Sequence, residues 1–223
     1  PTSSEAVRNA SGVRGVDPLE MNNAKFIVRC FSAEMYVDGF QVFQPQTDLE
    51  SLVNVERIEV VKGPTSTLFS GGTGAPVGGI INVISKSPTP VASREIGIRG
   101  GSYDTIGGYF DINQPIAPEH GVLFRITGES QRSDAYVDRV DSWQYSFFPT
   151  LMFAPSRDTT FTVRGRYSER QTDDYSGLPA FGTVDNAPFD IRRQRFIGAD
   201  NTPNTESRNA SVQGKLEHRF NDI

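Results

Sequence analysis

Apolar and polar residues alternate with a period of two along most of the chain after residue 88. Six segments carry this pattern: REIGIRGG (94–101), YDTIGGYFDINQ (103–114), VLFRITGESQ (122–131), WQYSFFPTLMFA (143–154), TFTVRGRYSE (160–169) and NASVQGKLEHRF (209–220). In the fourth segment, Trp143, Tyr145 and Phe147 fall on one side. Because side chains of a strand point alternately to opposite faces, the pattern predicts six amphipathic β-strands.

The lengths of these segments bear on the kind of sheet they form. Each extends for about 10 residues, which a tilted strand needs to cross a bilayer, whereas soluble strands are usually about 5 to 6 residues long. The connections alternate between short (115–121, 155–158) and long (132–142, 171–206). Aromatic residues near the strand ends are candidates for interfacial girdles: Tyr103, Trp143, Phe153, Tyr167 and Phe220. A soluble sandwich also alternates, so the pattern favours a transmembrane barrel without excluding a sandwich.

The chain before residue 88 has a mixed pattern. The segment AEMYVDGFQVF (33–43) alternates around Asp38 and Gly39, which predicts a hairpin. The segment ERIEVVK (56–62) predicts a strand. We therefore expect a small α+β domain over residues 1–88 and the alternating strands over residues 89–223.

A glycine-rich stretch lies between two apolar runs of the first domain. Its nine central positions hold five glycines: Gly71, Gly72, Gly74, Gly78 and Gly79. A phosphate-binding loop needs a lysine after its last glycine and then a helix, but the β-branched run 80–84 follows here. The dinucleotide pattern also fails because position 77 is Val77. The stretch is therefore interpreted as a turn and not as a nucleotide site.

Composition limits the classes of function further. Hydrophobic content of 36%, a mean hydropathy of -0.40 and the lack of an apolar run near 18 residues exclude a membrane-spanning helix. These values are compatible with a β-barrel, whose strands alternate. A net charge of -5 argues against a nucleic-acid partner. The single cysteine, Cys30, allows no intrachain disulfide and is expected to be a small buried residue.

Family resemblance adds to these patterns. The stretch VERIEVVKGPTSTLFSGGTGAPVGGIINVISKSP (55–88) closely resembles the end of the plug domain of TonB-dependent outer-membrane receptors, and EAVRNASGV and FIVRCFSAEMYVDGF resemble earlier plug segments. The later segments YSGLPAFGT and LEHRFND resemble the ferric-hydroxamate siderophore branch of that family. The resemblance extends over essentially the whole chain.

The resemblance implies a mainly β fold in which an α+β plug domain sits inside a barrel of about 22 antiparallel transmembrane strands. It assigns residues 1–88 to the C-terminal part of the plug and residues 89–223 to the first barrel strands. Six strands cannot close, because single-chain barrels start at about 8. We therefore expect an incomplete barrel, which is either a fragment of a longer receptor or a truncated product that does not transport by itself.

The resemblance also implies a transport function. A ferric siderophore binds between plug loops and barrel, and the TonB-ExbB-ExbD complex moves the plug to release it inward. Such a receptor lies among the lipids of a Gram-negative outer membrane, is not an enzyme, has no cofactor and carries iron only as cargo. A passive porin-like channel and a soluble β-sandwich binding module remain the alternatives.

Candidate ligand residues follow from the family motifs. Arg29 matches the arginine of an R-G-F motif, Gln44 approximately matches a glutamine of the next hairpin loop, and Tyr175 matches one aromatic of an outer loop. Arg29 also suits a bridge from plug to barrel, and Tyr175 suits packing within its loop. Gly177 stands where the second aromatic is expected, and Val53 stands where that branch has a plug tyrosine. The loss of these two aromatics indicates a siderophore other than ferrichrome.

The resemblance also identifies residues that shape the backbone of the plug and do not contact a ligand. The resemblance assigns the plug turn to Gly63, Pro64, Gly71, Gly72, Gly74, Gly78 and Gly79. Cys30 replaces the glycine of R-G-F, which puts a tight turn there in doubt. The acidic residues Asp134, Asp138 and Asp141 lack the spacing of a calcium loop and are interpreted as a solvated outer loop. No catalytic residue and no metal site is expected.

Overall fold

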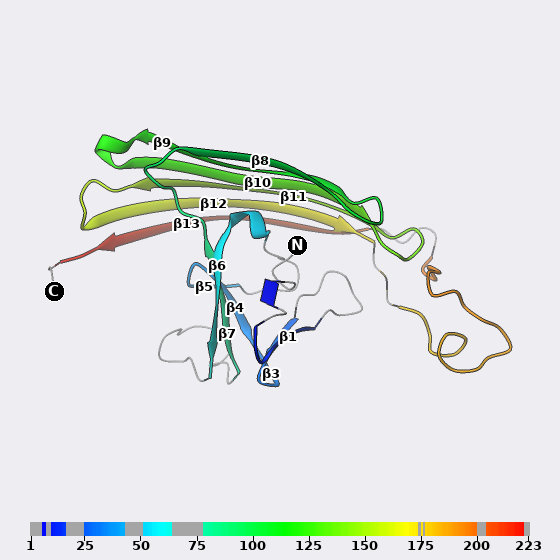
Figure 1. Cartoon of the computed structure of the whole chain (residues 1–223). Helices are drawn as coiled ribbons and strands as arrows, with labels where there is room; N and C mark the ends of the chain where they lie inside the picture. Colours follow the sequence, from blue (N-terminus) through cyan, green and yellow to red (C-terminus); the bar gives the residue numbers. More distant parts are fainter. Residues whose placement is uncertain are drawn as a thin grey trace.

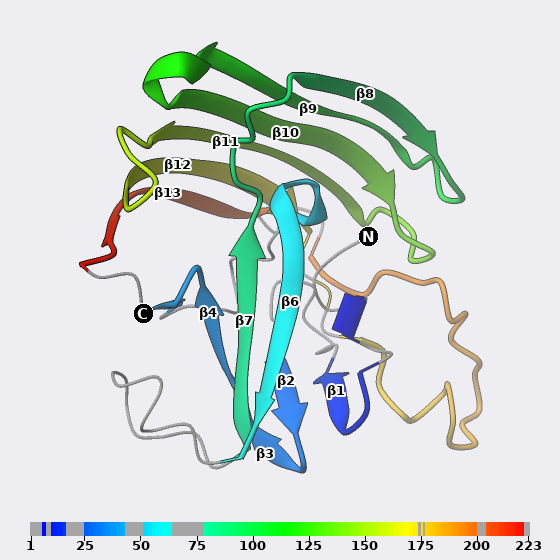
Figure 2. The same cartoon turned by 60° about the vertical axis from the view of Figure 1, so that its left-hand side comes forward.

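The computed structural model describes residues 6–7, 10–16, 25–42, 51–63, 78–173, 175, 177–199 and 204–220. These residues form two parts, an N-terminal unit of short strands and a large curved sheet, which we call the wall sheet (Figure 1). The N-terminal unit lies on the concave side of the wall sheet, and its longest strands run across the direction of the wall strands (Figures 1 and 2). Among the described residues, no helix is long and apolar enough to cross a membrane.

The N-terminal unit contains two small sheets. The first has the order β1-β2-β3, and the second has the order β5-β4-β7-β6, in which only β4 and β7 are parallel. The elements are β1 (Val13–Val16), β2 (Lys25–Val28), β3 (Phe31–Ser32), β4 (Glu34–Val37), β5 (Phe40–Gln41), the 3-10 helix η1 (Leu52–Asn54), β6 (Val55–Lys62) and β7 (Gly79–Ser85). The strand predicted over residues 56–62 is thus confirmed as β6.

Two tight turns of this unit use backbone with positive φ. Asp38 and Gly39, with φ of 52° and 85°, join β4 to β5, so the predicted hairpin is confirmed. Arg29 and Cys30, with φ of 50° and 68°, join β2 to β3. The turn therefore forms although Cys30 replaces the expected glycine. The expectation that Cys30 is buried was wrong, because its position in the turn leaves the thiol exposed.

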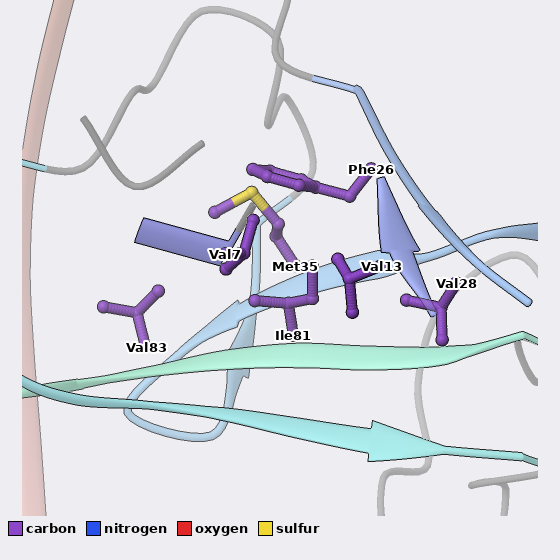
Figure 3. Packing of buried hydrophobic residues seen from close by; sticks show 7 residues of the cluster. All are labelled: Val7, Val13, Phe26, Val28, Met35, Ile81 and Val83. Carbon is purple, nitrogen blue, oxygen red and sulfur yellow. The ribbon is translucent and has the colours of Figure 1, made fainter. Parts of the chain in front are cut away.

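An apolar core holds the N-terminal unit together. Seven buried side chains from its two sheets and its first residues form one cluster (Figure 3): Val7, Val13, Phe26, Val28, Met35, Ile81 and Val83. Ile80, Ile81 and Val83 of β7 are each at most 1% exposed. The β-branched run after the glycines is therefore a central buried strand, and the unit is stabilised as water-soluble domains are, by apolar area removed from water.

The wall sheet consists of six antiparallel strands in sequence order, from β8 at one edge to β13 at the other. Its elements are β8 (Ser93–Gly100), β9 (Ile106–Ala117), the 3-10 helix η2 (Pro118–His120), β10 (Val122–Asp134), β11 (Asp141–Phe153), β12 (Thr159–Thr172) and β13 (Thr205–His218). All six predicted strands are confirmed. The last five are 12 to 14 residues long, longer than the sequence pattern indicated.

The wall sheet is apolar on the outside and polar on the inside. On its convex outer face, Ile98 and Val212 are 91% and 81% exposed. On its concave inner face, Asn113 and Thr127 are 0% and 1% exposed. A soluble sheet buries its apolar face and leaves its polar face in water, so this arrangement is inverted. It is the distribution of a sheet whose outer face meets lipid.

Aromatic side chains gather on the outer face near the long connections. The rings of Trp143 and Tyr145 are stacked at 5.5 Å, and those of Tyr145 and Tyr167 at 5.7 Å. The hydroxyls of Tyr145 and Tyr167 donate to Glu169 at 2.5 and 2.8 Å. Aromatic rings whose polar tips find partners suit a membrane interface, where one end is apolar and the other is wet.

Pro149 lies inside β11, where a missing N–H is normally disfavoured. The strand continues through it, but its pairing with β12 lapses between the pairs Phe147–Tyr167 and Thr150–Arg164. Gly165 lies opposite this gap, and a Cβ there would come within 3.0 Å of the proline ring. The lack of a side chain at Gly165 is what makes room for Pro149.

Candidate functional site

The segment that leaves β7 is fastened to the wall sheet by a buried carboxylate. Asp111 of β9, whose side chain is 7% exposed, accepts from Arg125 of β10 at 2.8 and 2.7 Å and from Lys86 at 2.8 Å. Arg125 also donates to the carbonyl oxygen of Ser87 at 2.9 Å. This cluster joins two wall strands and the connecting segment in one network of charge-assisted hydrogen bonds.

Asn113, two positions along the same face of β9, continues this fastening. Its amide nitrogen donates to the backbone oxygen and the hydroxyl of Thr89 at 3.0 and 2.9 Å, and its amide oxygen accepts from the Thr89 N–H at 2.9 Å. The side chain is fully buried. Asn113 thus satisfies both backbone groups of Thr89, in the segment between β7 and β8.

The hairpin between β4 and β5 contacts the wall through Asp38. One oxygen of this carboxylate lies 3.7 Å from Nε of Arg164 on β12, and the other accepts from the Ser85 N–H at 2.9 Å. The side chains of Asp38 and Arg164 are 7% and 14% exposed. Arg164 also donates to the hydroxyl of Ser87 at 3.0 Å. The hairpin, the end of β7 and the wall therefore meet at one point.

A further contact links η1 to the middle of the wall. The hydroxyl of Thr127 on β10 donates to the side-chain oxygen of Asn54 at 3.1 Å, and both residues are buried. Ser51 caps η1 by accepting from the Val53 N–H, which holds Asn54 against the wall.

We expect Thr127→Val to lower the free energy of unfolding by about 1 to 3 kcal/mol, because the buried Asn54 oxygen loses its donor. Thermal unfolding of the purified protein measures the change. The matched control is Thr105→Val, which removes an exposed hydroxyl contact to the Ser102 carbonyl and should change stability by less than about 0.5 kcal/mol. Equal effects of the two substitutions would show that the contact with η1 contributes nothing.

A cavity of about 410 Å³ lies between the hairpin and the wall strands β11 to β13. Its lining includes Asp38 and Gln41 from the hairpin and Arg164, Arg166 and Gln213 from the wall. This volume is in the range of small-molecule sites. A small hollow of about 30 Å³ lies farther along the wall and shares Phe148 and Arg166 with this cavity.

The structure places two of the three predicted ligand residues, in different parts of the fold. Arg29 is exposed at the turn between β2 and β3, where its N–H donates to the Gly12 carbonyl oxygen at 3.0 Å. Tyr175, in the long connection after β12, stacks on Phe196 with ring centroids 6.3 Å apart. Burial, and secondarily Tyr136, raises the pKa of the Tyr175 phenol. Gln44 lies outside the described residues.

The described glycines of the predicted plug turn flank the two ends of the glycine-rich stretch. Gly63 and Gly79 have φ of 106° and 126°, a region that favours glycine. A Cβ on Gly78 would come within 2.6 Å of the Val28 carbonyl oxygen, so close approach requires glycine there. The other assigned positions, Pro64, Gly71, Gly72 and Gly74, lie outside the described residues.

The acidic residues of the outer connections contact arginines and each other. Asp138 pairs with Arg192 at 3.1 Å, and Asp141 pairs with Arg132 at 3.4 Å. The carboxylate of Asp173 accepts from the Asp141 N–H at 3.1 Å. In the part of the chain that the structure describes, no group of three or more His, Cys, Asp or Glu residues is placed to hold a metal ion.

Sequence reasoning missed the fastening of the connecting segment. The sequence predicts an alternating strand over residues 103–114 but assigns no role to Asp111 or Asn113. The sequence did contain a signal for a buried polar cluster. An acidic and an amide residue stand at successive inner positions of β9, and two cations are available as partners, Lys86 after β7 and Arg125 on β10. The alternation shows which face these residues take, but only the strand register brings them together.

An apolar-cored unit fastened to the polar face of an inverted sheet is the arrangement expected of a plug against the wall of a barrel. Residues 1–80 match the family model described as TonB-dependent Receptor Plug Domain. The resemblance to TonB-dependent receptors found in the sequence is thereby confirmed, and this family is a class of transporters and receptors, not of enzymes.

Curated relatives agree with this assignment. The chain is 28% identical over 206 residues to the ferrichrome outer membrane transporter/phage receptor of Escherichia coli K12, which covers 88% of this chain and 27% of the relative. It is also 28% identical to the ferrioxamine B receptor of Salmonella typhimurium, over 84% of this chain and 27% of the relative. The chain thus spans about a quarter of the length of these relatives.

Solved structures share the fold. The ferripyoverdine receptor of the outer membrane of Pseudomonas aeruginosa, bound to ferripyoverdine, superposes with a TM-score of 0.84 at 23% identity, over 98% of this chain and 30% of that chain. The siderophore receptor PiuA from Acinetobacter baumannii gives a TM-score of 0.82 at 22% identity. The mainly β fold with a plug and antiparallel wall strands is therefore confirmed.

Proposed function

We propose that this chain is the later plug and the first wall section of a receptor that imports ferric siderophores across the outer membrane of a Gram-negative bacterium. The observation that carries the proposal is the pairing of an apolar-cored plug with the polar face of an inverted sheet. A passive porin needs no such plug, and a soluble sandwich would bury the apolar face instead of exposing it. Relatives named as ferrichrome and ferrioxamine B receptors support a siderophore of the hydroxamate class.

The proposed mechanism uses the plug as a gate. The ferric siderophore binds between plug loops and barrel, with Arg29, Gln44 and Tyr175 as ligand contacts. TonB, with ExbB and ExbD, draws on the plug and releases the cargo inward. Iron is then a substrate carried in its chelate and not a resident cofactor. Residue 88 is the proposed end of the plug and residue 89 the start of the wall.

The binding step is tested with the full-length receptor gene that contains this chain, expressed in a strain lacking its own siderophore receptors. Cells are offered radiolabelled iron bound to ferrichrome, ferrioxamine B or pyoverdine. We expect saturable surface binding of at least one chelate, and weaker binding after Arg29→Ala. Receptor present in the outer membrane that binds none of these or other ferric siderophores would contradict the proposal.

If the outer face of the wall sheet lies in a bilayer, a charged residue placed on it should lower the stability, and more so near the middle of the bilayer than near its edge. Val212 lies in the middle of β13 opposite Gly165, and Ile116 lies at the short-turn end of β9; both are exposed. Val212→Arg should lower stability in lipid vesicles by about 2 to 4 kcal/mol, and Ile116→Arg by about 0 to 1 kcal/mol. Urea unfolding of the receptor in vesicles measures both, and equal costs at the two depths would argue against a bilayer around the wall.

A further inference from the structure

The cavity between the β4–β5 hairpin and the wall has apolar sides. Val37, Phe40 and Val42 line it from the N-terminal unit, and Phe148 lines it from β11. Sites that hold small molecules are mostly apolar, and a few polar groups fix what they bind. With a volume of about 410 Å³, this cavity is large enough for such a ligand. Its polar lining therefore decides which chemistry it can take.

Gln41 of β5 offers a hydrogen-bond acceptor to this cavity. Its Nε2 donates to the carboxylate of Glu34 at 3.1 Å. Because a carboxylate only accepts hydrogen bonds, this contact fixes which end of the Gln41 amide faces Glu34. The other end, Oε1, is buried and has no donor among the residues that the structure describes. Gln41 lines the cavity, so a bound N–H or O–H group would satisfy this oxygen.

Gln213 of β13 offers a hydrogen-bond donor to the same cavity. Its Nε2 is buried and has no acceptor within the described part of the chain. Nε of Arg164, which also lines the cavity, makes no hydrogen bond there, although it lies 3.7 Å from the carboxylate of Asp38. Buried polar atoms normally have partners. The lining therefore calls for a bound group that both donates and accepts.

The charged side chains of the lining have partners of their own. Asp38 pairs with Arg164, and Arg166 has a separate interaction. The adjoining hollow, which Arg166 also lines, contains the carboxylates of Glu129 and Glu169. The described charges therefore do not select an ionised ligand. A carboxylate ligand, which only accepts hydrogen bonds, would also leave the amide oxygen in the lining without a donor.

We propose that this cavity is a site, which we call the amide site, for secondary amide groups of an uncharged ferric chelate as it passes between plug and wall. A secondary amide carries an N–H for Oε1 of Gln41 and a carbonyl oxygen for Nε2 of Gln213. Its carbon skeleton suits the apolar sides of the cavity. The inference rests on the proposed import function and refines it, because it names a chemical group of the cargo. Water and a side chain from a wall strand that follows β13 are the competing occupants.

The test uses diketopiperazine, a neutral ring with secondary amides, as a probe of the purified full-length receptor in detergent. Ligand-observed NMR titration measures the binding. We expect the probe to bind, and its N,N′-dimethyl form, which keeps the carbonyl oxygens but has no N–H, to bind about tenfold more weakly. Gln213→Leu removes the donor at similar volume and should weaken binding of the parent probe about tenfold. The matched control is Gln131→Leu, which alters the inner face of β10 outside the amide site and should leave binding unchanged. Succinate, an ionised probe, should not bind there.

Three outcomes separate the inference from the import function. A receptor that binds a ferric siderophore but not diketopiperazine, or whose Gln213→Leu and Gln131→Leu forms bind it equally, overturns the amide site and leaves import standing. Binding of diketopiperazine that depends on Gln213, in a receptor that binds no ferric siderophore, overturns import and leaves the amide site standing. Binding of the dimethyl form or of succinate as tight as that of the parent ring means that the cavity does not recognise the N–H, which also overturns the amide site. Protease resistance equal to wild type verifies that each variant is folded.

Discussion

Replacing Asp111 with alanine should lower the free energy of unfolding by about 3 to 5 kcal/mol, because two cations then remain buried without their counter-charge. Lys86 and Arg125 both depend on this carboxylate, and their side chains are 22% and 15% exposed. The connecting segment that they hold should become accessible at the same time. Thermal unfolding in detergent measures the first effect, and limited proteolysis between residues 86 and 92 measures the second.

The control for this prediction is an ion pair in water. Arg192 pairs with Asp138 in the outer connections at 3.1 Å, with side chains 74% and 51% exposed. Arg192→Ala should cost less than about 1 kcal/mol, because exposed pairs contribute little. The loss of stability caused by Lys86→Met should lie between these two values, because Asp111 keeps its ion pair with Arg125. If Asp111→Ala is as mild as Arg192→Ala, the buried cluster does not fasten the segment.

Gly79→Ala should lower the free energy of unfolding by an amount similar to that of Asp111→Ala, but for a steric reason. The residue has φ of 126°, and a Cβ would lie 2.1 Å from the Val61 carbonyl oxygen and 3.0 Å from Cα of Lys62. Both contacts are with backbone of the paired strand β6, which cannot move aside cheaply. Gly79→Ala should therefore cost about 3 kcal/mol or more and loosen the start of β7. Hydrogen exchange of the β6 and β7 amides would show the loosening.

Two other glycines separate the contributions of strain and collision. Gly63 has φ of 106° but open space at its Cβ position, so Gly63→Ala should cost about 1 to 2 kcal/mol from backbone strain alone. Gly214 of β13 has ordinary backbone and open space, and Gly214→Ala should be neutral. The loss of stability should therefore be largest for Gly79→Ala, smaller for Gly63→Ala and absent for Gly214→Ala. Any other order would show that the close approach of β6 is not what requires glycine at position 79.

The alternation of side chains predicted the wall sheet well, but it understated the length of the strands. β10 continues to Asp134 and β12 to Thr172, beyond the segments whose outer positions are apolar. Once a strand leaves the apolar band, both of its faces are polar and the period of two fades. The pairing of β10 with β11 continues there through backbone hydrogen bonds, which residue types do not reveal.

Predictions from the conformational preference of a single residue failed at two positions, Pro149 and Cys30. Pro149 disfavours a central strand, and the room it needs is provided by Gly165 on the neighbouring strand. Cys30 disfavours a tight turn, yet it adopts a φ of 68° between two paired strands. In both cases the surrounding pairing holds a conformation that the residue alone does not prefer.

The contacts between plug and wall could not be predicted from sequence for a related reason. Asn54 and Thr127 are 73 positions apart, and Lys86 and Asp111 are 25 apart. Each of these residues is ordinary in its own segment. Their roles depend on how the N-terminal unit sits on the concave face, which no periodicity encodes. The predicted ligand residues Arg29, Gln44 and Tyr175 rest on family motifs and stay predictions.

The central claim is that this chain belongs to a gated importer driven through its plug. It is tested most directly by uptake of radiolabelled ferric siderophore in a receptor-deleted strain that expresses the full-length receptor, with and without TonB. The account predicts surface binding in both strains, but accumulation of iron inside the cell only when TonB is present. Equal accumulation without TonB would contradict the account and would indicate a passive channel.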